Sequence, residues 1–451
     1  MSNSVIILAA GKGTRMESDL PKVLHRLAGA PILLHVMKSS ATLEPEKLII
    51  VAGHGAAAVG VVALDYDETA EIVLQSEQLG TGHAVSQAKS ALAGCTGDVI
   101  ILYGDTPFVR PETLQSLSAA RKTADIVVLG FNAGDPGRYG RLVMQGDAVS
   151  RIVEYKDASE QERAITFCNS GVICAKAEVL FSLLEVVGND NASGEYYLTD
   201  IVQLANDRNL SVAAVHCDEA ETMGINSRAE LAQAEASFQT RTRAEMMALG
   251  VSLTAPETVY FAYDTVLGRD SQIEPNVVFG PGVTVENSAH IRAFSHLEGC
   301  HVSSGAVVGP YARLRFGTEL AENVRIGNFV ELKNARIEDG AKVNHLSYIG
   351  DANIGEASNV GAGTITCNYD GVGKHHTEIG ASVFIGSNTM LVAPVTVGDE
   401  AMTASGSVIT KDVEPGALAI ARSEQGNKPG LAIKLFAMLR RRKAKQQERM
   451  L

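Results

Sequence analysis

The sequence of 451 residues contains no tryptophan, and aromatic residues make up only 5% of it. Its six cysteines are scattered and none belongs to a C-x-x-C pair, which argues against a zinc site or a disulfide framework and favours a reducing compartment. No apolar run approaches the roughly 20 residues of a membrane span. The apolar start Val5–Ala10 has no preceding Lys or Arg and is too short for a signal peptide. We therefore expect a cytoplasmic protein without a membrane span.

Basic residues are also in deficit, with 39 Lys and Arg against 52 Asp and Glu, which gives a formal net charge of −13. This balance argues against bulk nucleic-acid binding, which needs a basic surface. It leaves room for small anionic ligands, which need only a local cluster of donors. The chain is 45% hydrophobic and 20% charged, and its length predicts two or three globular domains.

The first half, residues 1–226, alternates short β-branched apolar runs with helix-like stretches. The predicted strands are Val5–Leu8, Leu48–Val51, Ile72–Leu74, Val99–Leu102 and Ile126–Leu129. The predicted helices are Pro31–Leu43, His83–Ala93 and Pro111–Arg121. Such alternation is typical of βαβ units, so we expect an α/β domain with a mostly parallel sheet.

Residues 227–250 form a separate segment between the two halves. Ser227–Leu249 is rich in Ala, Glu, Gln and Arg, follows the capping residue Asn226 and precedes Gly250. We interpret it as a linker helix; the alternative is that it is the last helix of the first domain.

The second half, residues 251–451, repeats every six residues. Apolar side chains recur at Ile273, Phe279, Val285, Ile291, Leu297, Val302, Val308, Leu314, Leu320, Ile326, Leu332, Ile337, Val343, Ile349, Ile354, Val360, Ile379, Ile385, Leu391, Val397, Met402 and Val408. A six-residue period fits neither an α-helix nor a hairpin and is the signature of a parallel β-helix. Thr364–Thr377 interrupts the period and is predicted to leave the coil as a loop. The tail Lys434–Leu451, with its basic run Arg440–Lys443, is predicted to be solvated or disordered.

Two polar segments follow strands of the first half. The loop Leu8–Met16 contains Gly11, Gly13 and Arg15, and Pro21-Lys22 comes shortly after it; Tyr103-Gly104-Asp105 ends another strand. A glycine-rich loop at the carboxyl end of a parallel strand can hold phosphates, and a carboxylate facing phosphates calls for a shared Mg²⁺. The sequence therefore predicts a nucleotide site, with Arg15 as a further candidate for contacting phosphate.

These segments, together with Leu79–Ala84, resemble the sugar-nucleotide pyrophosphorylase family. With the hexad half and the Asn368-Tyr369-Asp370 loop, the whole chain is similar to the bacterial bifunctional family that combines an N-acetylglucosamine-1-phosphate uridylyltransferase with a glucosamine-1-phosphate acetyltransferase. The resemblance implies a Rossmann-like nucleotidyltransferase domain, a left-handed parallel β-helix, and a homotrimer with the CoA site between adjacent coils. It implies the substrates glucosamine-1-phosphate, acetyl-CoA and UTP.

The resemblance also assigns residues in the first half. UTP would be bound by Leu8, Ala9, Ala10, Gly11, Lys22, Gln75, Gly80 and Thr81, with the last three reading uracil. The sugar would be held by Tyr103, Gly104, Gly140, Glu154 and Asn169, and Mg²⁺ by Asp105 and Asn226. Because the attacking sugar phosphate is already an anion, alignment and charge neutralisation can supply the catalysis without a general base.

In the second half, Arg315 and Lys333 are separated by about three hexads, a spacing that brings them to neighbouring coils and suits a phosphate clamp. Histidine is the side chain most often used as a general base, so His345 is a candidate base for an amine, although a lone His on a repeat is more often structural. The resemblance assigns this catalytic role to His345. It assigns the sugar phosphate to Arg315, Lys333, Tyr348 and Asn359, and acetyl-CoA to Ala362, Asn368, Tyr369, Ser387, Ser405 and Arg422. Cys367 is the rival nucleophile, but direct acetyl transfer is expected.

Two other functions stay open from the residues alone. One is a nucleotidyltransferase whose β-helix serves only assembly or regulation, and the other is a non-catalytic interaction protein with the same two modules. Asp105 and Asn226 argue against the second, while His345, Lys333 and Asn368-Tyr369 argue against the first.

Overall fold

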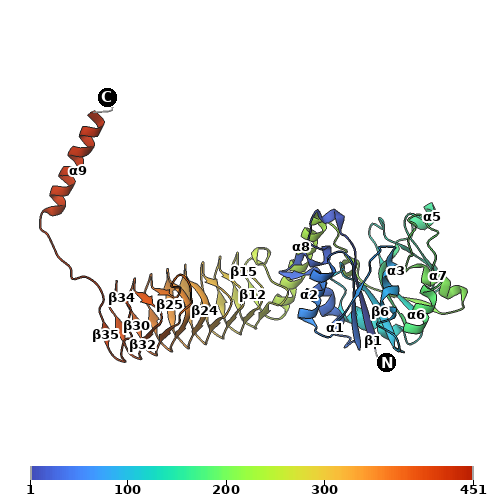
Figure 1. Cartoon of the computed structure of the whole chain (residues 1–451), viewed down its shortest axis with the longest axis horizontal. Coiled ribbons are helices and arrows are strands. Elements are labelled where there is room, and N and C mark those ends of the chain that lie inside the picture. The colour runs from blue at the N-terminus through green and yellow to red at the C-terminus, as the bar shows by residue number, and fades with distance from the viewer. Residues whose placement is uncertain (1–2, 449–451) are drawn as a thin grey trace. The chain divides into compact units, whose positions relative to one another are not determined.

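The computed structural model describes residues 3–448, which divide into two compact units. The first unit comprises the described residues up to Ala248 together with Tyr260–Thr265; the second comprises Leu249–Val259 and the described residues from Val266 onward (Figure 1). Across residues 3–448, no helix has the length and apolar character needed to cross a membrane.

The first unit is built on a twisted sheet with the strand order β11-β7-β10-β6-β1-β4-β5. All neighbouring pairs along this path are parallel except those made by β10, which runs antiparallel to β6 and β7. A β8-β9 hairpin joins the sheet through β10. The strands are β1 (Asn3–Ala9), β4 (Lys47–Ala52), β5 (Glu71–Leu74), β6 (Asp98–Tyr103), β7 (Ile126–Asn132), β8 (Arg141–Gln145), β9 (Ala148–Val153), β10 (Phe167–Lys176) and β11 (Val212–His216), and a separate ladder pairs β2 (Arg26–Leu27) with β3 (Ala30–Pro31).

All five predicted strands are confirmed. The apolar side chains of β1, β4, β6 and β7 are almost all buried, on both faces of the sheet, whereas those of the edge strand β5 are only partly buried or exposed. Ile6 and Ile101 belong to one buried cluster, whereas Val5, Ile7 and Ile100 belong to another on the opposite face. Helices cover both clusters, as expected for near-continuous apolar strands. The helices of the unit are α1 (Ile32–Ala41), α2 (Ala56–Tyr66), α3 (Thr81–Ser86), α4 (Pro111–Ala120), α5 (Glu160–Arg163), α6 (Ala177–Leu184), α7 (Asp200–Asp207) and α8 (Arg228–Ala248), with 3₁₀ turns η1 (Thr14–Met16), η2 (Lys22–Leu24), η3 (Gln87–Lys89) and η4 (Glu219–Thr222).

The predicted helix His83–Ala93 is wrong in its second half. The α-helix α3 ends at Ser86 and is followed only by η3. Beyond it, Ala93 N bonds to Ser90 O and Cys95 N to Leu92 O, so the chain closes two tight turns before β6. The predicted helix Ser227–Leu249 appears as α8, where Ala234 and Phe238 pack on Leu27, Ile32 and Phe108 of the first unit.

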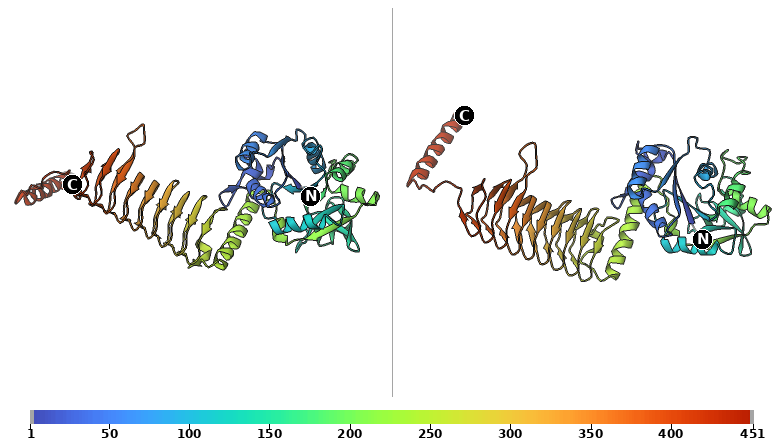
Figure 2. Two further views of the ribbon diagram at one scale, coloured as in Figure 1. Left: turned by 90° about the horizontal axis from the view of Figure 1, so that it is seen from below. Right: turned by 60° about the horizontal axis from the view of Figure 1, so that its bottom comes forward.

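The second unit is a left-handed parallel β-helix with three ladders of short strands (Figure 2). Neighbouring coils are linked by hydrogen bonds between residues 17 or 18 apart, as between Glu322 and Asp339 or Ala381 and Asp399. This spacing is three hexads, so each strand of a coil lies on the equivalent strand of the next.

Two of the three ladders share two long strands. One ladder contains β12 (Ser252–Leu253), β14 (Gln272–Ile273), β17 (His290–Ile291), β20 (Val307–Val308), β23 (Arg325–Asn328), β25 (Lys342–His345), β27 (Asn359–Val360), β30 (Phe384–Ile385), β33 (Met402–Thr403) and β35 (Leu418–Ala419). The second contains β13 (Val266–Leu267), β16 (Val283–Val285), β19 (Cys300–Val302), β22 (Thr318–Leu320), β29 (Thr377–Ile379) and β32 (Val395–Val397), and the third contains β15 (Val278–Phe279), β18 (His296–Leu297), β21 (Arg313–Leu314), β28 (Ile365–Cys367), β31 (Met390–Val392) and β34 (Val408–Ile409). The strands β24 (Glu331–Ile337) and β26 (Tyr348–Ile354) turn the corner between the second and third ladders. A 3₁₀ turn η5 (Pro256–Thr258) lies near the start of the unit.

The predicted interruption Thr364–Thr377 is too long. Ile365–Cys367 form strand β28 inside the coil, and only residues 368–376 stand out as a loop, coloured orange in Figure 2. The sequence pattern missed this because Thr364 and Thr366 replace aliphatic residues at buried positions. Their hydroxyls donate to the carbonyls of Gly361 and Gly350, so burial leaves no unpaired donor.

The inward positions predicted at Met402 and Val408 are also wrong, since both side chains are exposed. The hexad instead continues unbroken from Val397 to the buried Thr403 and Ile409. Thr403 fits the interior because its hydroxyl accepts a hydrogen bond from Gly386 N and lies 3.2 Å from the Thr389 hydroxyl.

The basic tail forms a helix, α9 (Leu431–Glu448), rather than a disordered segment. Its side chains from Leu431 to Gln447 are exposed, as expected for a solvated tail. The predicted tail residues 449–451 lie outside the described residues.

Candidate functional sites

A cavity of about 350 Å³ opens at the carboxyl ends of β1 and β6. In open α/β sheets, ligands bind at this edge. Ten of the residues assigned by resemblance line the cavity: Leu8, Ala9, Ala10, Gly11, Lys22, Gln75, Gly80, Thr81, Tyr103 and Asp105. The sheet register explains why, since Leu8 and Tyr103 are paired neighbours on β1 and β6.

Lys22 connects the two candidate metal ligands. Its ammonium donates to the carboxylate of Asp105 and, at 2.8 Å, to the amide oxygen of Asn226. The backbone ties the same two segments together, because Ile225 N donates to Asp105 O at 2.9 Å. Two oxygens that share one cation form a donor set of the kind hard divalent metals prefer.

The residues present therefore fit a divalent metal held jointly with substrate. No cluster of three or more His, Cys, Asp or Glu suited to a metal occurs within residues 3–448. A metal with only two protein oxygens must complete its coordination with phosphate or water, which is the usual arrangement for Mg²⁺ at nucleotide sites.

Gln75 and the start of α3 also line the cavity. The Gln75 side chain is buried, and its amide nitrogen donates to Gly80 O at 3.2 Å. Gly80 has φ +111°, and a Cβ there would lie 2.6 Å from the carbonyl oxygen of Tyr196. Only glycine fits this turn. The Thr81 hydroxyl accepts from Leu198 N at 3.0 Å, so the same segment fixes the first turn of α3.

The five other residues assigned to the first site surround this cavity without lining it. Gly104 N donates to Leu8 O, and Asn169 N donates to Gly140 O, each at 2.9 Å. The Glu154 carboxylate accepts from the Thr199 hydroxyl at 3.2 Å. Burial raises the pKa of Glu154, and burial followed by the Glu154 charge raises the pKa of Tyr103. Asn226 is connected to the cavity by the hydrogen bond that its amide oxygen accepts from Lys22.

Arg15 is the predicted residue that the structure does not bring to this cavity. It lies in η1, its side chain is exposed, and it does not line the cavity. Four residues that sequence reasoning missed do line it: Val23, Gln78, Ala84 and Glu195. Gln78 donates to Ala10 O at 2.5 Å and thus joins the glycine-rich loop to the loop before α3. No spacing rule in the sequence marks these positions.

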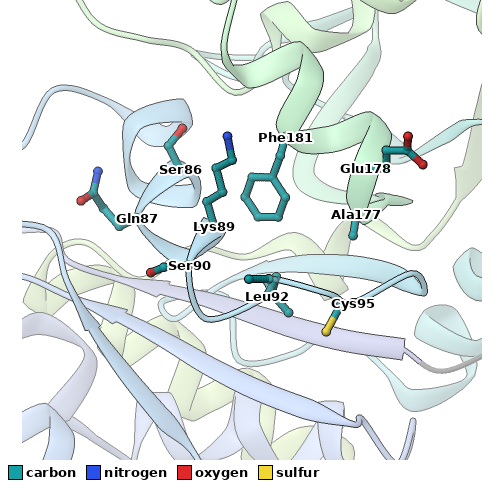
Figure 3. Close-up of a pocket in the computed structure, with 10 residues that line it drawn as sticks. Ser86, Gln87, Lys89, Ser90, Leu92, Cys95, Ala177, Glu178 and Phe181 are labelled. Carbon is teal, nitrogen blue, oxygen red and sulfur yellow. The ribbon is translucent and has the colours of Figure 1, made fainter.

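A larger cavity of about 640 Å³ lies elsewhere in the first unit, between the α3–η3 segment and α6. Figure 3 shows Phe181 of α6 facing Lys89 across it, with Leu92 and Cys95 along its floor. Lys89 is already paired with Glu185. None of the predicted site residues lines this cavity.

The second unit gathers its candidate residues along one corner. His345 ends β25, and Ala362, Ser387 and Ser405 follow β27, β30 and β33, strands of the same ladder. Backbone bonds stack these corners, from Gly363 N to His345 O, from Asn388 N to Ala362 O and from Gly406 N to Ser387 O. The Arg422 guanidinium donates to Ser405 O at 2.8 Å and extends the row by one coil.

His345 is exposed on this corner, not buried among aliphatic residues. Its Nδ1 lies 2.9 Å from the amide oxygen of Asn328, its partner in the preceding coil. An amide oxygen can only accept, so Nδ1 carries the proton and Nε2 keeps a lone pair. The imidazole is therefore held in the tautomer that a general base needs. Asn328 was not predicted, although its distance of one coil from His345 could have indicated it.

The assigned sugar-phosphate residues occupy neighbouring coils. Arg313 pairs with Glu331 and Leu314 with Leu332, a register that sets Arg315 beside Lys333, as the spacing predicted. Arg315 also forms an ion pair of 2.9 Å with Glu331, a residue that sequence reasoning missed. Tyr348 is the cross-strand partner of Glu331, and Asn359 begins β27.

The loop residues 368–376 are anchored through a buried carboxylate. Asp351 accepts from Asn334 at 2.8 Å and from Asn368 at 2.5 Å. Burial would raise the pKa of Asp351, but these hydrogen bonds outweigh it and the pKa is lowered. Tyr369 remains exposed, with the Lys374 ammonium 4.4 Å from its ring centre.

The surroundings of the rival nucleophile Cys367 disfavour its ionisation. Burial raises the pKa of its thiol, which disfavours the reactive thiolate. This agrees with direct acetyl transfer.

Comparison with known proteins matches both halves. Residues 5–194 match the MobA-like NTP transferase domain, and residues 376–411 match the bacterial transferase hexapeptide model of six repeats. The chain is 70% identical over 448 residues to the bifunctional protein GlmU of Ruegeria pomeroyi, covering 99% of this chain and 100% of that protein. It is 68% identical over 444 residues to the bifunctional protein GlmU of Ruegeria sp. strain TM1040, covering 98% and 99%. With the GlmU protein of Paracoccus denitrificans it shares 61% over 440 residues, covering 98% of each.

Proposed function

The chain belongs to the family of bifunctional GlmU proteins, and from this membership we propose how its two halves divide the chemistry. It is a bifunctional enzyme of UDP-N-acetylglucosamine synthesis, with glucosamine-1-phosphate acetyltransferase and N-acetylglucosamine-1-phosphate uridylyltransferase activities. Residues 1–226 would carry uridylyl transfer, 227–250 would join the halves, and 251–451 would carry acetyl transfer. We propose that acetylation comes first, so that its product is the sugar phosphate that the first half consumes.

In the uridylyltransferase site, the sugar phosphate would attack the α-phosphorus of UTP, and the bond to pyrophosphate would break. The cavity with the Lys22–Asp105–Asn226 cluster carries this assignment. Lys22 would bind the phosphates of UTP. Gln75, Gly80 and Thr81 would bind its uracil base. Tyr103, Gly104, Gly140, Glu154 and Asn169 would hold the sugar.

The family depends on a divalent metal, and we propose Mg²⁺ held by Asp105 and Asn226. When bound, it would neutralise phosphate charge and favour departure of pyrophosphate. The oxygen donors of both residues suit this hard cation.

In the acetyltransferase site, His345 Nε2 would take a proton from the 2-ammonium group of glucosamine-1-phosphate. The freed amine would attack the acetyl thioester, forming the amide bond as the bond to CoA sulfur breaks. The proton that the nitrogen then loses would pass to the departing thiolate, so that CoA leaves as the free thiol. The single observation that carries this role is the contact from Nδ1 to Asn328, which leaves Nε2 able to accept. Arg315, Lys333, Tyr348 and Asn359 would hold the sugar phosphate, and the corner residues Ala362, Ser387, Ser405 and Arg422, with Asn368 and Tyr369, would bind acetyl-CoA.

We further propose that the enzyme is a homotrimer. Support comes from an exposed apolar row on the β-helix formed by Phe294, Tyr311, Phe329 and Leu346. Phe294 and Tyr311 stack at 4.9 Å, and Tyr311 and Phe329 at 5.2 Å. Leu346 follows His345, so the row is continuous with the catalytic corner. A contiguous apolar row of this kind favours burial against another copy. A cytoplasmic location is proposed because UTP and acetyl-CoA are cytoplasmic metabolites.

Two assays on the purified protein test this division. One follows CoA thiol release with glucosamine-1-phosphate, and the other follows pyrophosphate release with UTP and N-acetylglucosamine-1-phosphate. His345→Ala should abolish the first and spare the second, whereas Asp105→Ala should do the reverse. Thiol release that survives in His345→Ala would exclude His345 as the base.

A further inference from the structure

His83 does not line the nucleotide cavity, yet it contacts the residue assigned to the base. It lies in the first turn of α3, and its Nδ1 is 3.1 Å from the side-chain nitrogen of Gln75. The Gln75 backbone is held in turn, since its N–H donates to Ala52 O at 2.8 Å beyond the end of β5. The buried Gln75 side chain therefore has few orientations available.

The orientation of the Gln75 amide follows from its acceptors. The Gly80 carbonyl, 3.2 Å away, can only accept, so the NH₂ end of the amide must face it. The same NH₂ group faces His83, which requires Nδ1 to be the unprotonated, accepting nitrogen. The His83 proton then sits on Nε2. Both N–H bonds of the Gln75 amide are used, and the other end, the oxygen, is left for the cavity.

A competing contact at His83 does not reverse this assignment. Gln87 places its side-chain nitrogen 3.1 Å from His83 Nε2 and 3.1 Å from His83 O. A neutral imidazole cannot accept at both nitrogens, so one of the two amides must give way. Gln75 is 4% exposed, whereas Gln87 is partly exposed and can bond water instead. An unpaired buried donor costs far more free energy than an exposed one. The Gln87 amide is therefore the one that does not donate to the His83 ring.

We propose that His83 is a positioning residue for base selection, which holds the Gln75 amide with its oxygen toward the nucleotide. Uracil presents an N–H donor at N3, whereas cytosine presents a lone pair at the same position. A fixed carbonyl oxygen pairs with the first and repels the second. The inference rests on the proposed uridylyl transfer and goes further by naming the residue behind the preference for UTP over CTP.

The test compares kcat/KM for UTP and CTP in pyrophosphate release with N-acetylglucosamine-1-phosphate. His83→Leu removes one of the two acceptors that hold the NH₂ end of the Gln75 amide and leaves only the 3.2 Å contact to Gly80 O. The weaker hold on the amide should lower the UTP/CTP ratio by at least about tenfold. His83→Asn places a side-chain oxygen close to the position of Nδ1 and should restore most of the ratio. Gln87→Ala leaves the Gln75 contact intact and should keep the wild-type ratio.

Further readouts separate selection from general damage. Thymine carries the same N3–H as uracil, so the UTP/TTP ratio should stay constant in His83→Leu. CoA thiol release should also be unchanged, which reports a folded chain. An unchanged UTP/CTP ratio in His83→Leu, or an equal loss in His83→Asn and His83→Leu, would overturn the role of His83. Wild-type protein that releases no pyrophosphate from UTP would instead refute the proposed function.

Discussion

Lys22 holds its ammonium group between the Asp105 carboxylate and the Asn226 amide oxygen, the two groups proposed to bind metal. Both Lys22 and Asp105 have side chains less than one-fifth exposed, so the pairing is shielded from solvent. A lysine and a divalent cation cannot both occupy this position without repulsion. Nucleotide phosphates offer Lys22 an alternative partner, so metal and nucleotide should bind together.

Metal binding without nucleotide should therefore be weak in the wild type and stronger in Lys22→Met. Removing the competing ammonium should tighten Mn²⁺ binding at least about tenfold, because the Asp105 charge is then left uncompensated. Titration of Mn²⁺ followed by electron paramagnetic resonance measures this directly. Lys12→Met, a change at an exposed lysine of the glycine-rich loop, serves as the matched control. Equal Mn²⁺ affinity in wild type and Lys22→Met would contradict the competition.

Glu154 should make the stability of the first unit depend on pH. Burial raises the pKa of its carboxyl in the folded state. Below the ordinary glutamate pKa of about 4.3, the carboxyl is protonated in both the folded and the unfolded state, so its burial does not lower the free energy of unfolding. As pH rises from this value through the raised pKa, ionisation favours the unfolded state and the free energy of unfolding falls. Glu154→Gln should therefore raise Tm at pH 8 by about 2–4 °C and have little effect at pH 4.5.

Differential scanning calorimetry at the two pH values measures the effect, with Glu160→Gln on the exposed α5 as control. In the pyrophosphate assay, Glu154→Gln should raise KM for N-acetylglucosamine-1-phosphate if Glu154 holds the sugar. Equal stabilisation at both pH values would show that the buried charge is not its cause.

Asn328 should be required for the basicity of His345. Its oxygen accepts from Nδ1 at 2.9 Å and so fixes the proton away from Nε2. Asn328→Leu removes this acceptor, and CoA thiol release should fall roughly 10- to 100-fold in kcat. Asn328→Asp keeps an acceptor and should retain much of the activity. Pyrophosphate release should be the same in all three proteins, and a normal pH–rate profile for Asn328→Leu would argue against the contact.

The β-helix could be predicted because its interior is repetitive. A six-residue period places one aliphatic side chain of each short strand inside the coil, and this pattern can be recognised from the sequence alone. The failures have a common cause. Thr364, Thr366 and Thr403 are interior residues that hydrogen-bond to backbone, and a pattern based on hydrophobicity cannot recognise them.

The candidate sites were predictable in part for similar reasons. Residues at strand ends, such as Tyr103 and Asp105, meet because parallel strands end at one edge. Contacts that depend on side-chain direction were not predictable. Asn328 beside His345 and Asp351 beneath Asn368 become evident only when the coil register is known.

The apolar row of Phe294, Tyr311, Phe329 and Leu346 gives a test of assembly. If the row is buried between copies, a charge at its centre must be desolvated without a partner, which should block association. Phe329→Glu should therefore convert a trimer into monomers, as measured by light scattering coupled to size-exclusion chromatography. CoA thiol release should be lost with the trimer, because the CoA site is expected between the β-helices of two adjacent copies. Pyrophosphate release should persist.

Val266→Glu is the matched control, since Val266 is 55% exposed, close to the 56% of Phe329, but belongs to another ladder. It adds the same charge to the same unit and should leave the trimer intact. A trimer that survives Phe329→Glu, or one that dissociates equally in Val266→Glu, would mean that the copies meet through a different face. The loss of thiol release must also follow the loss of trimer across protein concentrations, because a site completed by a second copy depends on association.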